Sequence, residues 1–208
     1  DYPRSKTVNV FDTYHGQVVT DPYRWLEDLD SEETQSWVKT QNQFTNQYLT
    51  NLPEIEAIKT ILDKALDQAT HSVPFREQSK YFYYYNSGDW QQSKLYYKEN
   101  NQGREKLVLD PNQFSEDGTV ALSGVSVSSD AKLLAYAISD GGSDWKTWKI
   151  RNLETSLDLE DKILWSKFSG AEWLKDNSGF YYSAYSEPQA GAELQDVNTN
   201  QKLYLHKI

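Results

Sequence analysis

The fold of this chain is governed by the motif VSSDAKLLAY at Val127–Tyr136, which returns as WLKDNSGFYY at Trp173–Tyr182. The two copies lie 46 residues apart (176 minus 130 for their shared Asp). A weaker third copy occupies Gln78–Tyr84. Repeating units of roughly 45 to 55 residues, each holding about four short strands, have the size of β-propeller blades. The pattern predicts that the Asp turn of each unit links two strands, and that the Tyr or Ala of the strand packs against the neighbouring blade.

Short aromatic strands separated by Gly, Asn and Asp turns fill the chain from residue 73 onwards. The predicted strands are residues 81–85, 94–98, 107–109, 133–138, 147–150, 162–165, 180–182 and 202–205. Residues 73–208 therefore predict blades 1 and 2 and the start of blade 3, whereas a closed propeller needs at least about four blades. We expect a piece of a longer protein, whose open blade face exposes apolar surface and promotes association.

Residues 1–72 follow a different pattern, in which an extended arm to about residue 30 precedes two amphipathic helices. The first helix is expected over residues 31–48, and the second begins near Pro53. Their apolar faces are Trp37, Gln41, Phe44 and Tyr48 in the first helix, and Ile55, Ile58, Leu62, Ala65, Leu66 and Ala69 in the second. The short link at residues 50–52 predicts an antiparallel pair. Neither helix can cover the other's apolar surface, so both are expected to pack on a larger domain. With the strands of residues 73–208, the predicted fold class is α+β.

The stretch DPYRWLED at Asp21–Asp28 joins the arm to the first helix. Its Asp-Pro step predicts a turn, because Pro restricts the residue before it. Tyr23 and Trp25 are large apolar bodies that need a partner surface, so we interpret them as docking residues. Asp30 or Ser31 can cap the helix that follows, with Glu33 reaching back as in a capping box.

The composition limits the kinds of partner that this chain can have. Its 208 residues are 38% hydrophobic and include seven Trp and fifteen Tyr, enough for a core. The net charge of -10 argues against nucleic-acid binding. No apolar run approaches a membrane span and no signal-peptide pattern opens the chain, so no membrane partner is expected. The chain lacks Met and begins at Asp1, which also suggests a piece of a longer protein. We expect a cytoplasmic location, with the periplasm as the alternative.

The residues that could carry catalysis are scattered. A serine nucleophile elbow needs Gly-x-Ser-x-Gly, and the nearest approach, Gly124–Ser128, lacks the second Gly and lies in a predicted blade. The histidines are His15, His71 and His206, without metal-ligand spacing, and are interpreted as surface or packing residues. The absence of Cys removes thiol catalysis, disulfides and Cys-ligated metal. We expect no catalytic residue, no metal site and no cofactor in this chain, which alone should be inactive.

Ten short motifs, taken in order, carry a resemblance to a known family. They are Tyr2–Pro3, Tyr14–Gly16, Asp21–Asp28, Trp37–Val38, Gln41–Asn42, Tyr81–Gly88, Leu109–Asn112, Asp117–Leu122, Gly142–Trp145 and Gln201–Tyr204. Together they resemble the amino-terminal portion of the prolyl oligopeptidases, serine peptidases of family S9, across nearly the whole chain.

The resemblance implies a serine endopeptidase that cleaves short peptides after proline. It implies an α/β-hydrolase domain on which residues 1–72 would pack, and a seven-bladed propeller to which residues 73–208 would contribute blades 1, 2 and the start of 3. The Ser, Asp and His of the triad would come from that hydrolase domain, which this chain lacks. The implied partners are proline-containing peptides and the hydrolase domain.

Three places in the predicted blades are candidate sites. By the resemblance, Phe168 matches a propeller Phe that lines the substrate pocket, and the alternative is packing between blades. Asp144 could add negative potential near a cavity, although capping of its Gly-rich turn is the favoured role. The polar segment Glu187–Asn200 resembles a loop that gates substrate entry, or is a plain exposed connector.

Two other functions stay open from the sequence. One is a non-catalytic peptide-binding or scaffold propeller module. The other is a related oligopeptidase with a preference for basic residues, whose specificity pocket would lie outside this chain.

Overall fold

The chain forms two compact units, residues up to Leu66 and residues Asp67–Ile208. The computed structural model describes residues 2–100, 103–194 and 197–208. The boundary lies before the predicted division at residues 72 and 73, because the strand β3 (Thr70–His71) pairs with β5 (Lys80–Asn86) of the second unit.

The first unit begins with a hairpin of β1 (Phe11–Tyr14) and β2 (Gln17–Thr20). His15 and Gly16 form its two-residue turn, with φ angles of 51° and 82°. Two successive left-handed residues match the twist of the flanking strands, and Gly adopts that conformation without steric cost. The prediction of an extended arm missed this hairpin, although the Gly in its turn was a signal.

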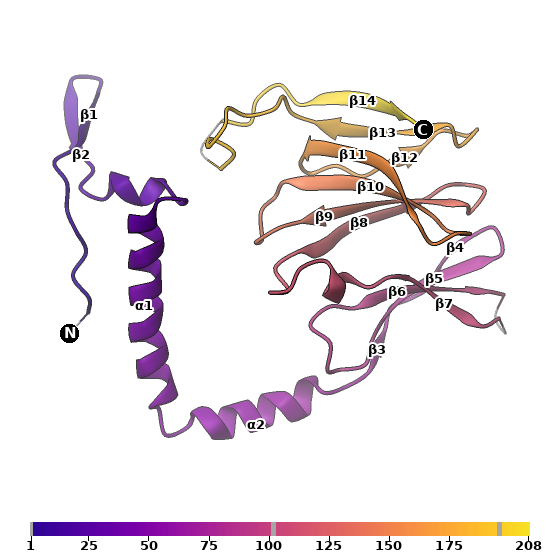
Figure 1. Cartoon of the computed structure of the whole chain (residues 1–208), viewed down its shortest axis with the longest axis horizontal. Coiled ribbons are helices and arrows are strands. Elements are labelled where there is room, and N and C mark those ends of the chain that lie inside the picture. Colours follow the sequence, from indigo (N-terminus) through magenta and orange to yellow (C-terminus); the bar gives the residue numbers. More distant parts are fainter. Residues whose placement is uncertain (1, 101–102, 195–196) are drawn as a thin grey trace. The chain divides into compact units, whose positions relative to one another are not determined.

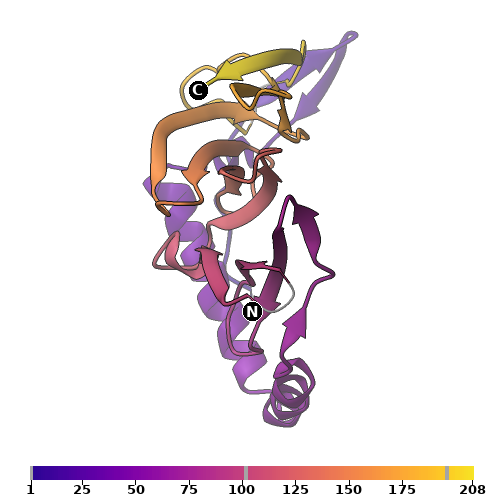
Figure 2. The ribbon, with the colours of Figure 1, turned by 90° about the vertical axis from the view of Figure 1, so that its right-hand side faces the viewer.

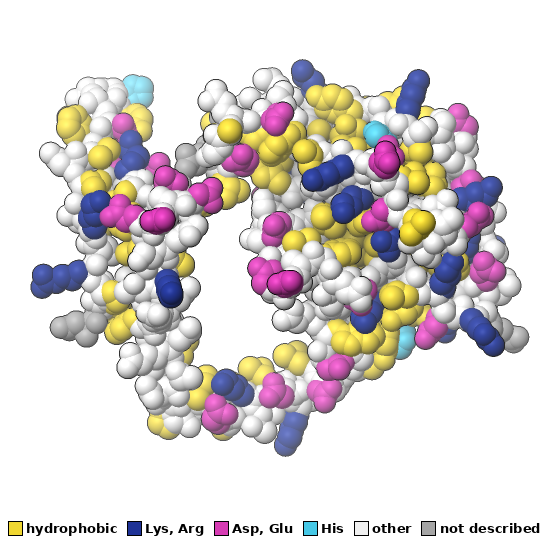
Figure 3. Space-filling model, in the orientation of Figure 1, with side chains coloured by type: hydrophobic (Ala, Val, Ile, Leu, Met, Phe, Trp, Pro, Cys, Tyr) yellow, Lys and Arg dark blue, Asp and Glu magenta, His cyan; other side chains and the backbone are white. Residues whose placement is uncertain are grey.

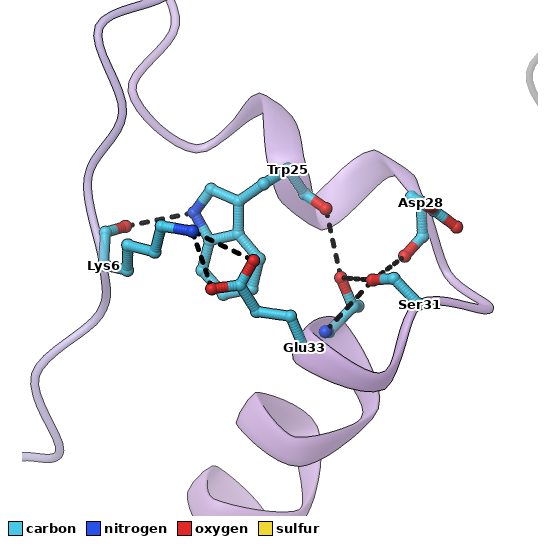
Figure 4. Close-up of polar contacts among 6 residues, drawn as sticks. Lys6, Trp25, Asp28, Ser31 and Glu33 are labelled. Atoms are coloured by element: carbon cyan, nitrogen blue, oxygen red, sulfur yellow. Dashed lines mark hydrogen bonds and ion pairs between the residues drawn. The ribbon is translucent and has the colours of Figure 1, made fainter.

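A 3-10 turn, η1 (Arg24–Glu27), leads into the long helix α1 (Glu32–Thr50). Ser31 caps α1, since its Oγ accepts a hydrogen bond from the Thr34 backbone N–H at 3.2 Å (Figure 4). Glu33 instead forms an ion pair with Lys6 at 2.8 Å. Of the two predicted caps, Asp30 and Ser31, the structure uses Ser31, and the predicted capping box with Glu33 is wrong. A capping box needs the acid three residues after the cap, where Thr34 stands.

Of the two aromatic residues of the stretch Asp21–Asp28, Trp25 packs within this unit, whereas Tyr23 is 46% exposed. Trp25 donates from Nε1 to the Lys6 carbonyl at 3.0 Å and meets Trp37 edge-on, with ring centroids 6.3 Å apart. The predicted turn is present, because the Tyr23 N–H is bonded to the Asp21 carboxylate at 3.3 Å.

The second helix, α2 (Ile55–Leu66), leads away from the end of α1 and does not fold back along it (Figure 1). The predicted antiparallel pair is wrong, because residues 51–54 make successive turns, with Leu52 N–H bonded to Leu49 O and Ile55 N–H bonded to Leu52 O. None of the residues of α2 is buried. Its apolar side chains lie bare in Figure 3, and Ile61 and Leu66 are 67% and 71% exposed.

The second unit consists of three antiparallel sheets that follow one another along the chain (Figures 1 and 2). The first sheet has the order β3-β5-β6-β7, with β4 also pairing with β5. The second has the order β11-β10-β9-β8, and the third has the order β12-β13-β14. The strands not yet bounded are β4 (Phe75–Glu77), β6 (Lys94–Glu99), β7 (Glu105–Leu109), β8 (Ala121–Val127), β9 (Leu133–Ser139), β10 (Lys146–Asn152), β11 (Asp158–Ser166), β12 (Glu172–Trp173), β13 (Gly179–Ala184) and β14 (Lys202–Lys207). A short 3-10 turn, η2 (Pro111–Gln113), follows β7.

The central strand β9 buries both of its faces between sheets. Leu134 and Tyr136 belong to a core shared with the first sheet, and Ala135 and Ala137 belong to a core shared with the third. Alternate residues of a strand point to opposite faces, so one strand serves both cores. The two small Ala side chains leave room for Trp148 and Phe180, which are 1% and 0% exposed. The predicted packing of the repeat Tyr and Ala against neighbouring sheets is confirmed.

The repeat turns have one geometry and bond to one another. Asp130 and Asp176 each accept a hydrogen bond at 3.1 Å from the backbone N–H two residues on. The Gln78 side chain donates to the Ser129 carbonyl at 2.7 Å, and the Ser129 N–H and Oγ both donate to Asn177 Oδ1 at 2.9 Å. The turns of the three repeats therefore connect neighbouring sheets, and the shared Asp geometry confirms the repeat.

The third sheet ends in an uncovered apolar face. Tyr181 on β13 and Leu203 and Leu205 on β14 are 42%, 70% and 40% exposed, and Tyr181 pairs with Leu205 in register. This is the exposed apolar surface that the sequence predicts. In the part of the chain that the structure describes, no helix is long and apolar enough to cross a membrane.

Candidate functional site

Phe168 lies at the end of a strained bend that begins in the last two residues of β11. The four residues Trp165–Phe168, here named the Phe168 bend, begin and end in the left-handed region, with φ of 59° at Trp165 and 51° at Phe168. A left-handed conformation at a residue other than Gly costs on the order of 1 kcal/mol or more, and persists only where the surroundings determine it. Between these two residues, Ser166 and Lys167 are 0% and 7% exposed.

Ser166 anchors one side of the bend to the core. Its Oγ accepts a hydrogen bond from Trp148 Nε1 at 3.1 Å and donates to the Ser183 carbonyl at 2.8 Å. The Tyr185 backbone N–H also donates to the Trp165 carbonyl at 2.9 Å. The bend is thereby tied to β10 and to the region at the end of β13, which explains how its strain is held.

Lys167 anchors the other side through aromatic rings. Its ammonium lies over the Trp145 ring, 3.7 Å from the centroid, and its carbonyl accepts from the Gln201 side chain at 3.0 Å. The Trp145 ring also meets Trp165 and Tyr185 edge-on, at centroid distances of 5.5 and 6.0 Å. We name Trp145, Trp165, Tyr185 and Lys167 the Lys167 cluster.

The Phe168 side chain itself is 73% exposed. Among the described residues Phe168 is not packed between sheets, and its packing between blades stays the alternative prediction. A large aromatic that is held on a rigid bend and presented to solvent can offer apolar contact to a ligand at low entropic cost. Contact with substrate stays a prediction.

The turn that carries Asp144 is closed by its neighbours. The Ser143 N–H bonds to the Asp140 carbonyl at 2.9 Å, and the Trp145 N–H bonds to Ser143 Oγ at 3.1 Å. Asp140 also accepts from Thr119 Oγ1 at 3.1 Å. Asp144 is exposed. The capping that the sequence assigned to Asp144 is therefore performed by Ser143 and Asp140.

The connection Glu187–Asn200 touches the Lys167 cluster. The Glu193 carbonyl accepts a hydrogen bond from Trp145 Nε1 at 2.6 Å. Residues 195 and 196 of this predicted gate lie outside the described residues. Its role as a gate or as a plain connector stays a prediction.

The three histidines lie in separate places. His15 is in the β1–β2 turn, His71 is in β3, and His206 in β14 lies 2.7 Å from the Asp161 carboxylate. Ser126 lies within β8, where it pairs with Ala135, and not on the strand-to-helix turn that a nucleophile elbow requires. Among the described residues, no group of three or more His, Cys, Asp or Glu could hold a metal ion.

A polar cavity of about 320 Å³ lies between the η2 segment and the second sheet, lined in part by Tyr136, Arg151 and Asp158. Asp158 accepts from Arg151 Nε and from the Tyr136 hydroxyl, both at 2.7 Å. Burial opposes ionisation of Asp158, but these two bonds hold its pKa below the ordinary value. Burial, followed by the bond to Asp158, raises the pKa of Tyr136. Arg151 and Asp158 pair with each other, and Tyr136 bonds to the same carboxylate, so these three residues of the second sheet offer no free reactive group.

Lys167 was missed by the sequence reasoning. A single Lys at the end of a strand is ordinarily exposed. Trp145 and Trp165, which precede Lys167 in the chain, were the only signal of an aromatic ring beneath its ammonium.

Comparison with known proteins places the chain. Residues 2–208 match the family described as "Prolyl oligopeptidase, N-terminal beta-propeller domain". The chain belongs to this family. The resemblance and the fold class that the sequence predicts are thereby confirmed.

Curated prolyl oligopeptidase relatives are much longer than this chain. The prolyl endopeptidase of Elizabethkingia miricola is 40% identical over 207 residues, which are 100% of this chain and 29% of the relative. Prolyl oligopeptidase A of Amanita bisporigera is 30% identical over 239 residues, covering 100% of this chain and 31% of the relative. The chain thus spans about 30% of the length of these peptidases.

Solved prolyl oligopeptidase structures have the same fold. One structure from a study of two prolyl endopeptidases matches with a TM-score of 0.85 and 30% identity, over 100% of this chain and 31% of that one. Prolyl oligopeptidase B from Galerina marginata, bound to a 35mer hydrolysis and macrocyclization substrate, matches with a TM-score of 0.77 and 26% identity. That match covers 100% of this chain and 32% of the Galerina chain.

Proposed function

We propose that this chain is the amino-terminal arm and the first blades of a prolyl oligopeptidase that hydrolyses short peptides after proline. The observation that carries the proposal is the family match over residues 2–208. Identity of 40% to a prolyl endopeptidase over 207 residues supports it.

The chemistry belongs to residues outside this chain. Acyl transfer needs a Ser nucleophile activated by a His base, with an acid that orients the His. In this proposal those groups come from an α/β-hydrolase domain of the same protein, and residues 73–208 form part of the propeller that covers them. Phe168 contributes an apolar contact for a peptide side chain.

The first unit docks that domain. The apolar face of α2 is bare, with Ile58, Ile61, Leu62 and Leu66 between 49% and 71% exposed. Covering one such side chain stabilises a protein by about 1.5–3 kcal/mol. Residues 1–72 therefore have an exposed apolar surface that a hydrolase domain can bury.

The test is to determine the coding sequence beyond Ile208 and to assay the whole encoded protein. We expect further blades, then Gly-x-Ser-x-Gly, Asp and His in that order, and cleavage of a proline-linked chromogenic peptide that a serine-directed inhibitor abolishes. The 208-residue chain alone should show no turnover. A stop codon directly after Ile208, or triad-type turnover by the chain itself, would refute the proposal.

A peptide panel on the whole protein separates the alternatives. Cleavage after Lys or Arg instead of Pro would indicate the related oligopeptidase with basic specificity. Peptide binding without cleavage would indicate a binding or scaffold module.

A further inference from the structure

Lys167 is a buried cation at the centre of the Phe168 bend. It is 7% exposed, yet its ammonium is directed at a ring, 3.7 Å from the centroid of Trp145. A charge that leaves water needs compensation, and the negative face of an indole supplies it most strongly when solvent is excluded. We name this contact between the Lys167 ammonium and the Trp145 ring the seat. It is a specific cation–π interaction, because the ammonium is shielded from solvent.

The seat determines the direction in which the Phe168 side chain projects from the protein surface. The left-handed residues Trp165 and Phe168 bracket the two buried anchors, Ser166 and Lys167. The Ser166 hydroxyl fixes the start of the bend. Lys167, the residue immediately before Phe168, fixes its end through the contact with the Trp145 ring. Freeing Lys167 would let the φ of Phe168 relax to an ordinary value and would swing its exposed ring away.

The same cluster reaches the connection between β13 and β14 at two points. Trp145 Nε1 donates to the Glu193 carbonyl at 2.6 Å, and the Gln201 side chain donates to the Lys167 carbonyl at 3.0 Å. Trp145 and Lys167 thus join the Phe168 bend to this connection at Glu193 and at Gln201.

We propose that Lys167 is a positioning residue for peptide recognition, which holds Phe168 in place through its seat on the Trp145 ring. The inference rests on the proposed function. It assigns Lys167 no contact with the peptide, so its effect must pass through Phe168.

The test uses the whole encoded protein and four variants: Lys167→Met, Lys167→Arg, Phe168→Ala and the double variant Lys167→Met/Phe168→Ala. Met keeps the length of Lys without its charge, whereas Arg keeps a cation that stacks on aromatic rings. The matched control is Lys175→Met, at an exposed lysine in a repeat turn. KM and kcat are measured with a proline peptide that carries an apolar side chain before the proline.

We expect Lys167→Met and Phe168→Ala each to raise KM by about three- to tenfold with kcat nearly unchanged. Lys167→Arg should restore most of the loss, and Lys175→Met should match the unmodified protein. The double variant should be no worse than Phe168→Ala alone, because one residue acts through the other. Additive losses, or a normal KM in Lys167→Met beside a raised KM in Phe168→Ala, would overturn the proposal. A normal KM in Phe168→Ala would overturn it as well.

A second measurement does not depend on peptidase activity. In protein labelled with 5-fluorotryptophan, the Trp145 resonance, assigned with Trp145→Phe, should shift in Lys167→Met and not in Lys175→Met. A shift without any proline-peptidase activity refutes the proposed function while leaving the seat intact. If the Trp145 resonance does not shift in Lys167→Met while the protein has normal peptidase activity, the contact between Lys167 and Trp145 is refuted and the proposed function stands.

Discussion

Replacing Trp148 with Phe should weaken the second unit strongly. The indole is 1% exposed and packs against Phe180 at a centroid distance of 6.4 Å, close to Gly124, where an added Cβ would meet the ring at 3.3 Å. Its Nε1 also donates to Ser166 Oγ at 3.1 Å. The hydrogen bond contributes about 1 kcal/mol and the space left by the smaller ring costs about 1–2 kcal/mol, so we expect a total loss of about 2–3 kcal/mol.

The assay is urea unfolding of the chain, followed by far-ultraviolet circular dichroism, for Trp148→Phe, Ser166→Ala and the double variant. The coupling free energy should be about 1 kcal/mol, because both single changes remove the same hydrogen bond. Tyr181→Phe, at a side chain that is 42% exposed, is the control and should change stability by less than about 0.5 kcal/mol. A loss below about 0.5 kcal/mol for Trp148→Phe would refute the packing argument, and full additivity would refute the role of the hydrogen bond.

Three further predictions concern single polar contacts. Asp158→Asn should lower the melting temperature at neutral pH, by an amount equivalent to about 1 kcal/mol. The folded-state pKa of Asp158 is depressed, so its contribution is present above the unfolded value near 3.9 and is lost as pH falls through the folded value. Melting curves of both proteins should therefore converge in acid, and a constant gap would contradict this reasoning. Asn177→Ala removes the acceptor of two bonds from Ser129 at a left-handed residue (φ 60°), so urea unfolding should show a loss of about 1–2 kcal/mol. Asn177→Gly, which tolerates that φ, should lose less, and equal losses would show that the backbone does not matter. Ser31→Ala should raise hydrogen exchange in the first turn of α1, corresponding to about 1 kcal/mol, with Ser31→Gly milder. Unchanged exchange would mean that the cap contributes nothing.

Much of the second unit could be predicted because blades are local. Each strand and its turn are specified by residues that are close in sequence, and the copies at Val127–Tyr136 and Trp173–Tyr182 fold alike. The hairpin β1–β2 was missed because its strands are exposed and carry little apolar alternation. The antiparallel helix pair was wrong because two apolar faces do not determine what covers them.

The candidate site was predictable only in part. Phe168 was found through the family resemblance, and its exposure and left-handed backbone could not be read from the neighbouring letters. The partners of Lys167 lie at Trp145 and Gln201, on other segments of the second unit.

The sequence by itself determined the repeat, eight of the strands of the second unit and the family, since each depends on spacing along the chain, whereas β8 and the choice of Ser31 over Asp30 as the cap of α1 came from the structure. Only the tertiary structure decided that Ser166 and Lys167 are buried anchors while Phe168 faces solvent. The physical reason is that burial and cation–π contact depend on which segments, distant in sequence, pack together in the fold. Local conformational propensity does not determine that packing. The bend keeps its strained backbone because Trp148, Ser183 and Trp145, brought by other strands and turns, hold it from both sides.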